Sequence, residues 1–74
     1  MTKKELSQKL QSSNIDQGMY CLDGGFPNEA LTLKQDGYIW QVYYSEKGLK
    51  TGLKAFDSES EACHSMLHMI LKGV

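Results

Sequence analysis

Alternation of apolar and polar side chains is clearest in residues 38–44, Tyr-Ile-Trp-Gln-Val-Tyr-Tyr. Aromatic and β-branched residues dominate this stretch, and a turn signal stands on each side, so it predicts a strand. The preceding Asp-Gly pair at 36–37 suits a two-residue hairpin loop. Because strand side chains alternate, that loop places four large apolar residues on one face, which we expect to carry the core: Leu31, Leu33, Trp40 and Val42.

Three further strands follow from the same pattern. Residues 29–35 predict the strand before this hairpin, and residues 19–22 predict a short earlier one. Residues 23–28 are expected to form a loop, because two glycines and a proline disfavour a strand interior. Residues 45–48 predict a four-residue hairpin loop into a last strand, whose register would add two residues to the core face: Leu49 and Leu53.

Helical signals mark both ends of the chain. Thr2 and Glu5 have the spacing of a capping box, and Leu6 and Leu10 follow at i, i+4, so residues 3–12 predict an amphipathic helix. A second box at Ser58 and Glu61 opens a helix that Lys72 and Gly73 are expected to end. Its apolar stripe has helical periodicity and consists of Ala62, Cys63, Met66, Leu67, Ile70 and Leu71.

These elements predict one α+β domain spanning residues 1–74. Its order is an N-terminal helix, a four-stranded antiparallel meander and a C-terminal helix. Both helices are expected on one sheet face, which leaves the other face to solvent. That open face would present Thr32, Lys34, Ile39, Gln41, Tyr43, Lys50 and Lys54. Such residues suit either a partner interface or the ordinary protection of an open sheet against aggregation.

Charge argues against a nucleic-acid partner. The chain has eight lysines, no arginine and nine acids, for a net charge of −1, and arginine is the side chain that grips phosphate and guanine bidentately. The helix–sheet–helix order is similar to that of the double-stranded RNA-binding domain, which carries lysines at the start of its last helix. The corresponding positions here are Asp57, Glu59 and Glu61, which would repel RNA.

Localisation is expected to be cytoplasmic. No apolar run approaches the ~20 residues that span a bilayer, and residues 1–6 have two lysines without the apolar stretch of a secretory signal. Cys21 and Cys63 lie outside any C-x-x-C spacing and are interpreted as reduced, buried thiols, with a disulfide between them as the alternative.

No set of residues predicts catalysis, a metal or a cofactor. His64 and His68 have an i, i+4 spacing, but no third ligand accompanies them, so two solvated histidines are the simpler interpretation. Cys63 is on the apolar stripe, where a thiol is inert. The Gly24-Gly25 pair lacks the spacing of phosphate-binding loops and is interpreted as a strand connection. We therefore expect a protein that is not an enzyme.

Three segments resemble the small immunity proteins of bacterial polymorphic toxin systems, of the contact-dependent inhibition type. The similar motifs are L-D-G-G-x-P-N-E at residues 22–29, W-x-V-Y-Y-S-E-x-G at 40–48 and F-x-S-E-x-E-A at 56–62. The resemblance implies a binding protein that neutralises a cognate toxin domain of the nuclease type by steric occlusion. Acids on the immunity protein would then match a basic cleft.

The acids available for that role lie in the loops, where solvation and helix capping also account for them. Together with the resemblance, they predict a partner-binding set near the ends of the middle strands: Asp23, Glu29, Tyr43 and Glu46. The alternative hypothesis is a non-catalytic structural or regulatory interaction module, such as a homodimer formed through exposed sheet edges.

Overall fold

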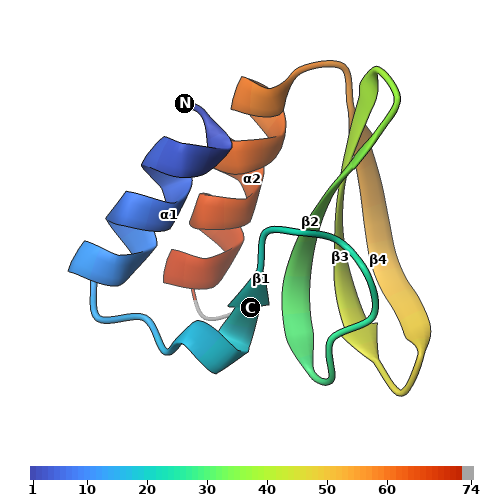
Figure 1. The fold of residues 1–74 in the computed structure, drawn as a ribbon, viewed down its shortest axis with the longest axis horizontal. Helices are drawn as coiled ribbons and strands as arrows, with labels where there is room; N and C mark the ends of the chain where they lie inside the picture. The colour runs from blue at the N-terminus through green and yellow to red at the C-terminus, as the bar shows by residue number, and fades with distance from the viewer. Residues whose placement is uncertain (73–74) are drawn as a thin grey trace.

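The fold has two layers, a pair of helices and a four-stranded sheet (Figure 1). The computed structural model describes residues 1–72. Helices α1 (Lys3–Ser12) and α2 (Glu59–Leu71) lie on the same side of the sheet, and α2 packs directly against it. The predicted α+β class and the single helical face are confirmed. The remaining elements are η1 (Gln17–Met19), β1 (Tyr20–Cys21), β2 (Ala30–Asp36), β3 (Ile39–Glu46) and β4 (Leu49–Phe56).

Both helices begin where their caps predict. The Thr2 hydroxyl accepts a hydrogen bond from the Glu5 amide at 3.2 Å, and the Glu5 carboxylate accepts one from the Thr2 amide at 2.9 Å. These two bonds satisfy amides that the first turn leaves without helical partners. In α2, the Ser58 hydroxyl accepts from the Glu61 amide at 3.1 Å. The predicted C-terminal glycine, Gly73, lies outside the described residues.

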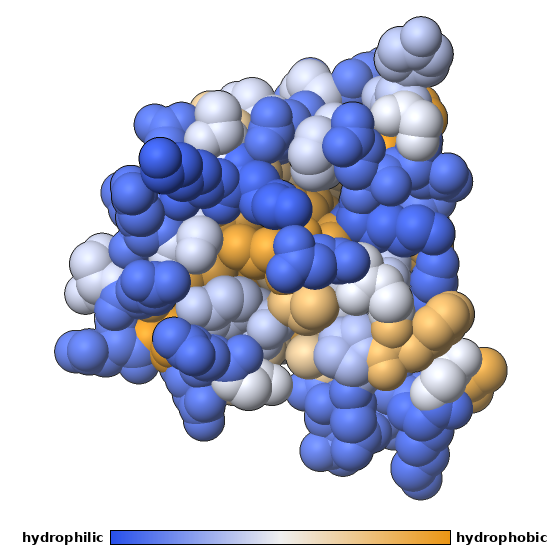
Figure 2. Space-filling view, in the orientation of Figure 1, coloured by the Kyte–Doolittle hydropathy of each residue, from blue (hydrophilic) through white to orange (hydrophobic). Residues whose placement is uncertain are grey.

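The core lies between the two layers, on the sheet face that the strand pattern predicts. Figure 2 shows apolar surface in the hollow between helices and sheet, framed by hydrophilic side chains. Trp40 is half-buried at the margin of this core. Its buried members come from both helices and from the two central strands: Leu6, Leu10, Leu31, Leu33, Val42, Ala62, Cys63, Met66, Leu67 and Ile70.

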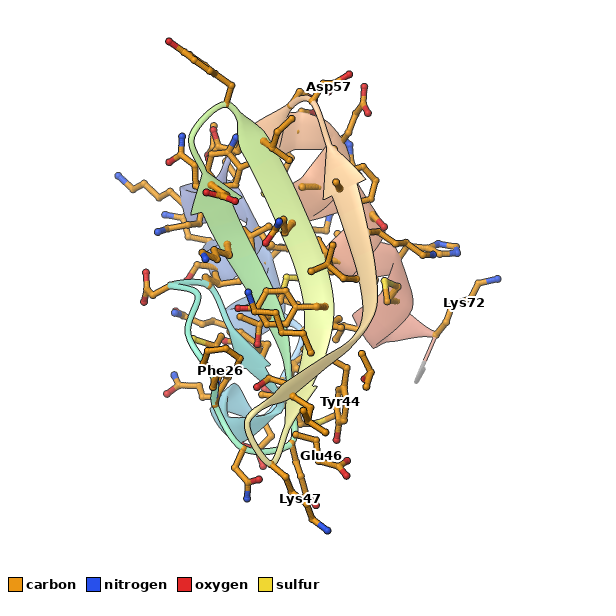
Figure 3. All side chains as sticks on the ribbon, turned by 90° about the vertical axis from the view of Figure 1, so that its right-hand side faces the viewer. Phe26, Tyr44, Glu46, Lys47, Asp57 and Lys72 are labelled. Atoms are coloured by element: carbon orange, nitrogen blue, oxygen red, sulfur yellow. The ribbon has the colours of Figure 1, made fainter. Side chains whose placement is uncertain are left out.

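The expectation of an all-antiparallel meander is wrong for the first strand. Strands β2, β3 and β4 are antiparallel neighbours, but β1 runs parallel to β2, with Tyr20 opposite Leu31. A parallel neighbour requires a connection that crosses the sheet. Residues 22–29 make that connection over the face turned away from the helices (Figures 1 and 3). A two-residue strand is too short for its sequence pattern to reveal its direction.

The crossing loop overturns the expectation of an open outer sheet face. Thr32 and Tyr43, both expected in solvent, have no exposed surface. The Tyr43 hydroxyl donates a 2.7 Å hydrogen bond to the Gly25 carbonyl, which ties the loop to β3. Ile39, further along β3, keeps 37% of its surface exposed. The centre of this face is therefore covered, and its end at Ile39 is open.

Both hairpin loops differ from the predicted ones. The first loop consists of Gly37 and Tyr38, so Leu33 lies opposite Val42 and not opposite Trp40. This shift moves partners by two residues, an even number, so every side chain keeps its predicted face. The second loop is residues 47–48, whose φ angles of 52° and 76° fit a two-residue hairpin turn and replace the predicted four-residue loop.

A β-bulge and the shorter hairpin loop both change the predicted register of β4. Val42 pairs with Lys54 and Tyr44 pairs with Thr51, so β4 has one residue more than β3 between these pairs. Gly52 within the bulge has a φ of 62°, a backbone conformation that glycine adopts without a Cβ clash. The placement of Leu49 and Leu53 in the core is wrong. Leu53 lies within the bulge and is 44% exposed, whereas Leu49 precedes the bulge, lies opposite Glu46 at the end of the hairpin and is 66% exposed.

We expect Gly52→Ala to lower the free energy of unfolding by about 1 kcal/mol, because a left-handed backbone strains an L-residue. A Cβ at Gly52 would meet no atom within 4 Å, so crowding would add nothing. Urea denaturation followed by the fluorescence of Trp40 measures the change. Gly52→Asn should cost less, since asparagine tolerates this conformation. Equal stability of the alanine variant and the original protein would contradict the bulge geometry.

Candidate functional site

A groove of about 530 Å³ opens where the sheet, near the β3–β4 turn, meets the C-terminal end of α2 (Figure 1). Tyr44 forms its β3 side, and Tyr44 pairs with Leu31 on β2 and with Thr51 on β4. Gly52 contributes no side chain, so the bulge leaves this side of the groove open. The lining is mainly apolar and comes from η1, the end of the crossing loop, three strands and α2: Met19, Glu29, Leu31, Tyr44, Thr51, Gly52, Met69 and Ile70.

Two acids lie close enough to Tyr44 to act on its phenol and are called the rim acids: Glu29, which lines the groove, and Glu46, which lies beside Tyr44 outside the lining. Glu29 is exposed, lines the groove and has a φ of 54°, which is unusual for a residue with a side chain. Glu46 is half-buried at the end of β3, near Tyr44 (Figure 3). Neither acid has an ion-pair partner, because the single ion pair among residues 1–72 joins Lys3 and Asp23. The groove therefore combines an apolar floor with uncompensated negative charge.

The pKa of Tyr44 reflects this environment. Partial burial raises the pKa of its phenol above 10.0, and the carboxylates of Glu46 and Glu29 raise it further, because both oppose a second negative charge. Between pH 10.0 and the raised value, the folded state holds a proton that the unfolded state has lost. The contribution of this group to stability is therefore present below pH 10.0 and is lost as the pH rises through the folded pKa.

We expect the paired change Glu29→Gln and Glu46→Gln to lower the Tyr44 pKa towards its ordinary value, with a remaining elevation from burial. The pKa of Tyr43 is also raised, by burial first and by Cys21 second, and should not respond. Titration of the tyrosine Cζ carbons by NMR measures both values in one sample. If the Tyr44 pKa is the same in the original protein and in the doubly substituted variant, these acids lie too far away to act on it.

Of the four residues predicted to bind a partner, the structure brings Glu29 and Glu46 together around Tyr44. Asp23 lies elsewhere, beside the start of α1, where its carboxylate is 3.1 Å from the Lys3 ammonium. Asp23 is 84% exposed at its side chain, so solvent screening leaves this ion pair little effect on stability. It is not part of the groove.

Tyr43 lies on the outer face of the sheet, beneath the crossing loop. It is fully buried, and the Lys50 ammonium lies 4.7 Å from its ring centroid and 5.3 Å from the ring centroid of Phe26. These contacts and the bond to the Gly25 carbonyl hold the crossing loop on the sheet. Tyr43 thus presents no surface to solvent, whereas its neighbour Tyr44 is 37% exposed at the groove.

The Cys63 side chain of α2 lies in the core and not at the surface. Cys63 is fully buried, and burial and the nearby Glu59 raise the pKa of its thiol, which is therefore protonated at neutral pH. Cys21 is a free thiol like Cys63 but is only half-buried, in contrast to the predicted full burial. Residues 1–72 contain no cluster of three or more His, Cys, Asp or Glu suited to a metal ion.

Sequence reasoning missed the apolar part of the groove. Met19, Met69 and Ile70 are far apart in the chain and have no shared motif. Gly52 offered one usable signal, because an isolated glycine within a strand pattern indicates a bulge.

Neither helix in residues 1–72 is long and apolar enough to cross a bilayer. Comparisons of the chain with family models, with curated proteins and with solved structures find no match.

Proposed function

We propose that this protein is an immunity protein that binds a cognate bacterial toxin domain in the cytoplasm and neutralises it by covering its functional surface. The observation that carries the proposal is the apolar groove whose rim acids, Glu29 and Glu46, have no ion-pair partner. Isolated acids beside apolar surface suit a basic partner, since complementary charge speeds encounter and apolar contact holds the complex.

The resemblance to immunity proteins supports the same proposal. Residues 40–48 of the similar motifs form β3 and its turn, and they include Tyr44 and Glu46 at the groove. Residues 22–29 form the crossing loop and end at Glu29. A nuclease toxin has a basic cleft for phosphates, so a rim of carboxylates would compete with its substrate.

Co-expression tests the proposal. A toxin domain encoded beside this protein should arrest the growth of a bacterial host, and the protein should restore growth and co-purify with the toxin at equal stoichiometry. A catalytically inactive toxin serves as the control for the origin of the arrest. Failure to bind or protect against the toxin domains encoded next to it would contradict the proposal.

A homodimeric interaction module is the second candidate, and one observation favours it. Strand β4 forms an open edge of the sheet, and Leu49 and Leu53 are exposed along it. The same strand carries Lys50 and Lys54, and lysines on an edge strand disfavour pairing between two copies. Light scattering at high micromolar concentration decides, because a strict monomer removes this candidate.

A further inference from the structure

We propose that the groove receives a basic side chain, arginine above all, from a partner segment whose neighbouring residues are apolar. This inference rests on the proposed function, because it names the partner chemistry that the same surface would recognise. The guanidinium would lie between the carboxylates of Glu29 and Glu46, with its aliphatic stem along Tyr44.

The lining favours such a segment over a purely charged or purely apolar one. Glu29 is the single charged residue among the eight that line the groove. The Tyr44 ring offers a face on which a guanidinium or its stem can stack. Met19 and Met69 add flexible thioether side chains, which adapt to the shape of an incoming residue. A volume of about 530 Å³ is within the usual range for pockets that hold small groups.

The chain's own cations do not satisfy the rim acids. Lys50 lies over the rings of Tyr43 and Phe26, on the outer face of the sheet. Lys47 follows Glu46 directly, but in Figure 3 it extends away from Tyr44 at the end of the sheet. Lys72 extends outward from the end of α2 in the same view. The negative charge at the groove is therefore left for an external cation.

The backbone conformation of Glu29 also supports a functional role for this residue. Its φ of 54° is in the left-handed region, which glycine and asparagine adopt far more readily than glutamate. Asn28, a residue type that tolerates this conformation, is one position earlier but does not adopt it. Strained backbone of this kind is found preferentially at functional positions.

Methionine methyl NMR tests the inference with a defined probe, a capped hexapeptide of alternating leucine and arginine. We expect the Met19 and Met69 methyl signals to shift with peptide concentration, because both residues line the groove. Met1 serves as an internal control, because its amino group contacts Ser60 at the start of α2, away from the groove. A peptide with citrulline for arginine has nearly the same shape without the charge and should bind about tenfold more weakly.

The variant Glu29→Gln should bind the arginine peptide about tenfold more weakly than the original protein does, which is the affinity expected for the citrulline peptide. The variant Asp23→Asn, which removes an acid outside the groove, should leave binding unchanged. The inference would be overturned if the citrulline peptide, or a peptide with glutamate in place of arginine, bound as tightly as the arginine peptide. Methyl shifts that depend on protein concentration without peptide would also overturn it, since a second copy would then be the occupant. Peptide binding without protection in cells would reject the proposed function and leave the groove chemistry intact.

Discussion

Tyr43→Ala is expected to lower the free energy of unfolding by about 3–4 kcal/mol, a large part of the roughly 5 kcal/mol typical of a small domain. Tyr43 is fully buried, so its truncation leaves a cavity on the outer sheet face. The change also removes the hydrogen bond to the Gly25 carbonyl and the ring beneath the Lys50 ammonium. The crossing loop would then lose its main attachment to the sheet.

Urea denaturation, followed by the fluorescence of the single Trp40, measures the loss, and the adjacent tyrosine provides the control. Tyr44→Ala should cost clearly less, because Tyr44 is 37% exposed. Tyr43→Phe should cost about 1 kcal/mol, through the lost hydrogen bond, and remains measurable if the alanine variant does not fold. An alanine variant of Tyr43 no less stable than that of Tyr44 would mean that the outer face is open.

The sequence predicted the layers of the fold because local chemistry determines them. Thr2 and Glu5 can satisfy each other's backbone amides in one arrangement, and the spacing of Leu6 and Leu10 defines the buried side of α1. The core face of β2 and β3 was also predictable, although the hairpin register was displaced. A displacement by two residues exchanges partners such as Trp40 and Val42 but keeps each on its face.

The outer face could not be predicted from strand alternation. Alternation correctly separates Tyr43 from Val42, but it cannot show that a loop distant in sequence covers one of the two faces. Burial of Thr32 and Tyr43 depends on the path of residues 22–29, which follows from the parallel direction of β1. That direction is a property of tertiary packing.

The candidate site was predictable in its charges and not in its shape. Glu29 and Glu46 were recognisable as acids at strand ends, and the β2–β3 pairing brings them to one end of the sheet. Asp23 had the same appearance in sequence, but the crossing loop carries it to Lys3. The groove itself depends on the bulge at Gly52 and on the end of α2, which no motif connects.

Charge reversal of the two rim acids, Glu29→Lys with Glu46→Lys, is expected to weaken binding to the cognate toxin about 100-fold, equivalent to about 2.7 kcal/mol. The acids are exposed or half-buried, so most of the loss should appear in the association rate, where complementary charge acts before contact. Growth protection in the co-expression assay should fail accordingly. Surface plasmon resonance at low salt and at about 0.5 M salt separates the electrostatic part, which screening reduces.

A control with the same kind of charge change is available at the other end of the molecule. Asp57 is exposed, and it lies at the end of the molecule that is far from Glu46 (Figure 3). The substitution Asp57→Lys therefore alters the net charge without altering the groove. If long-range attraction alone governed binding, single reversals at Asp57 and at Glu29 would weaken it equally. If the groove is the contact, Glu29→Lys should have much the larger effect, and the dissociation rate should rise as well, because a lysine there would repel the partner's basic side chain. Equal effects at both positions would place the toxin on another surface.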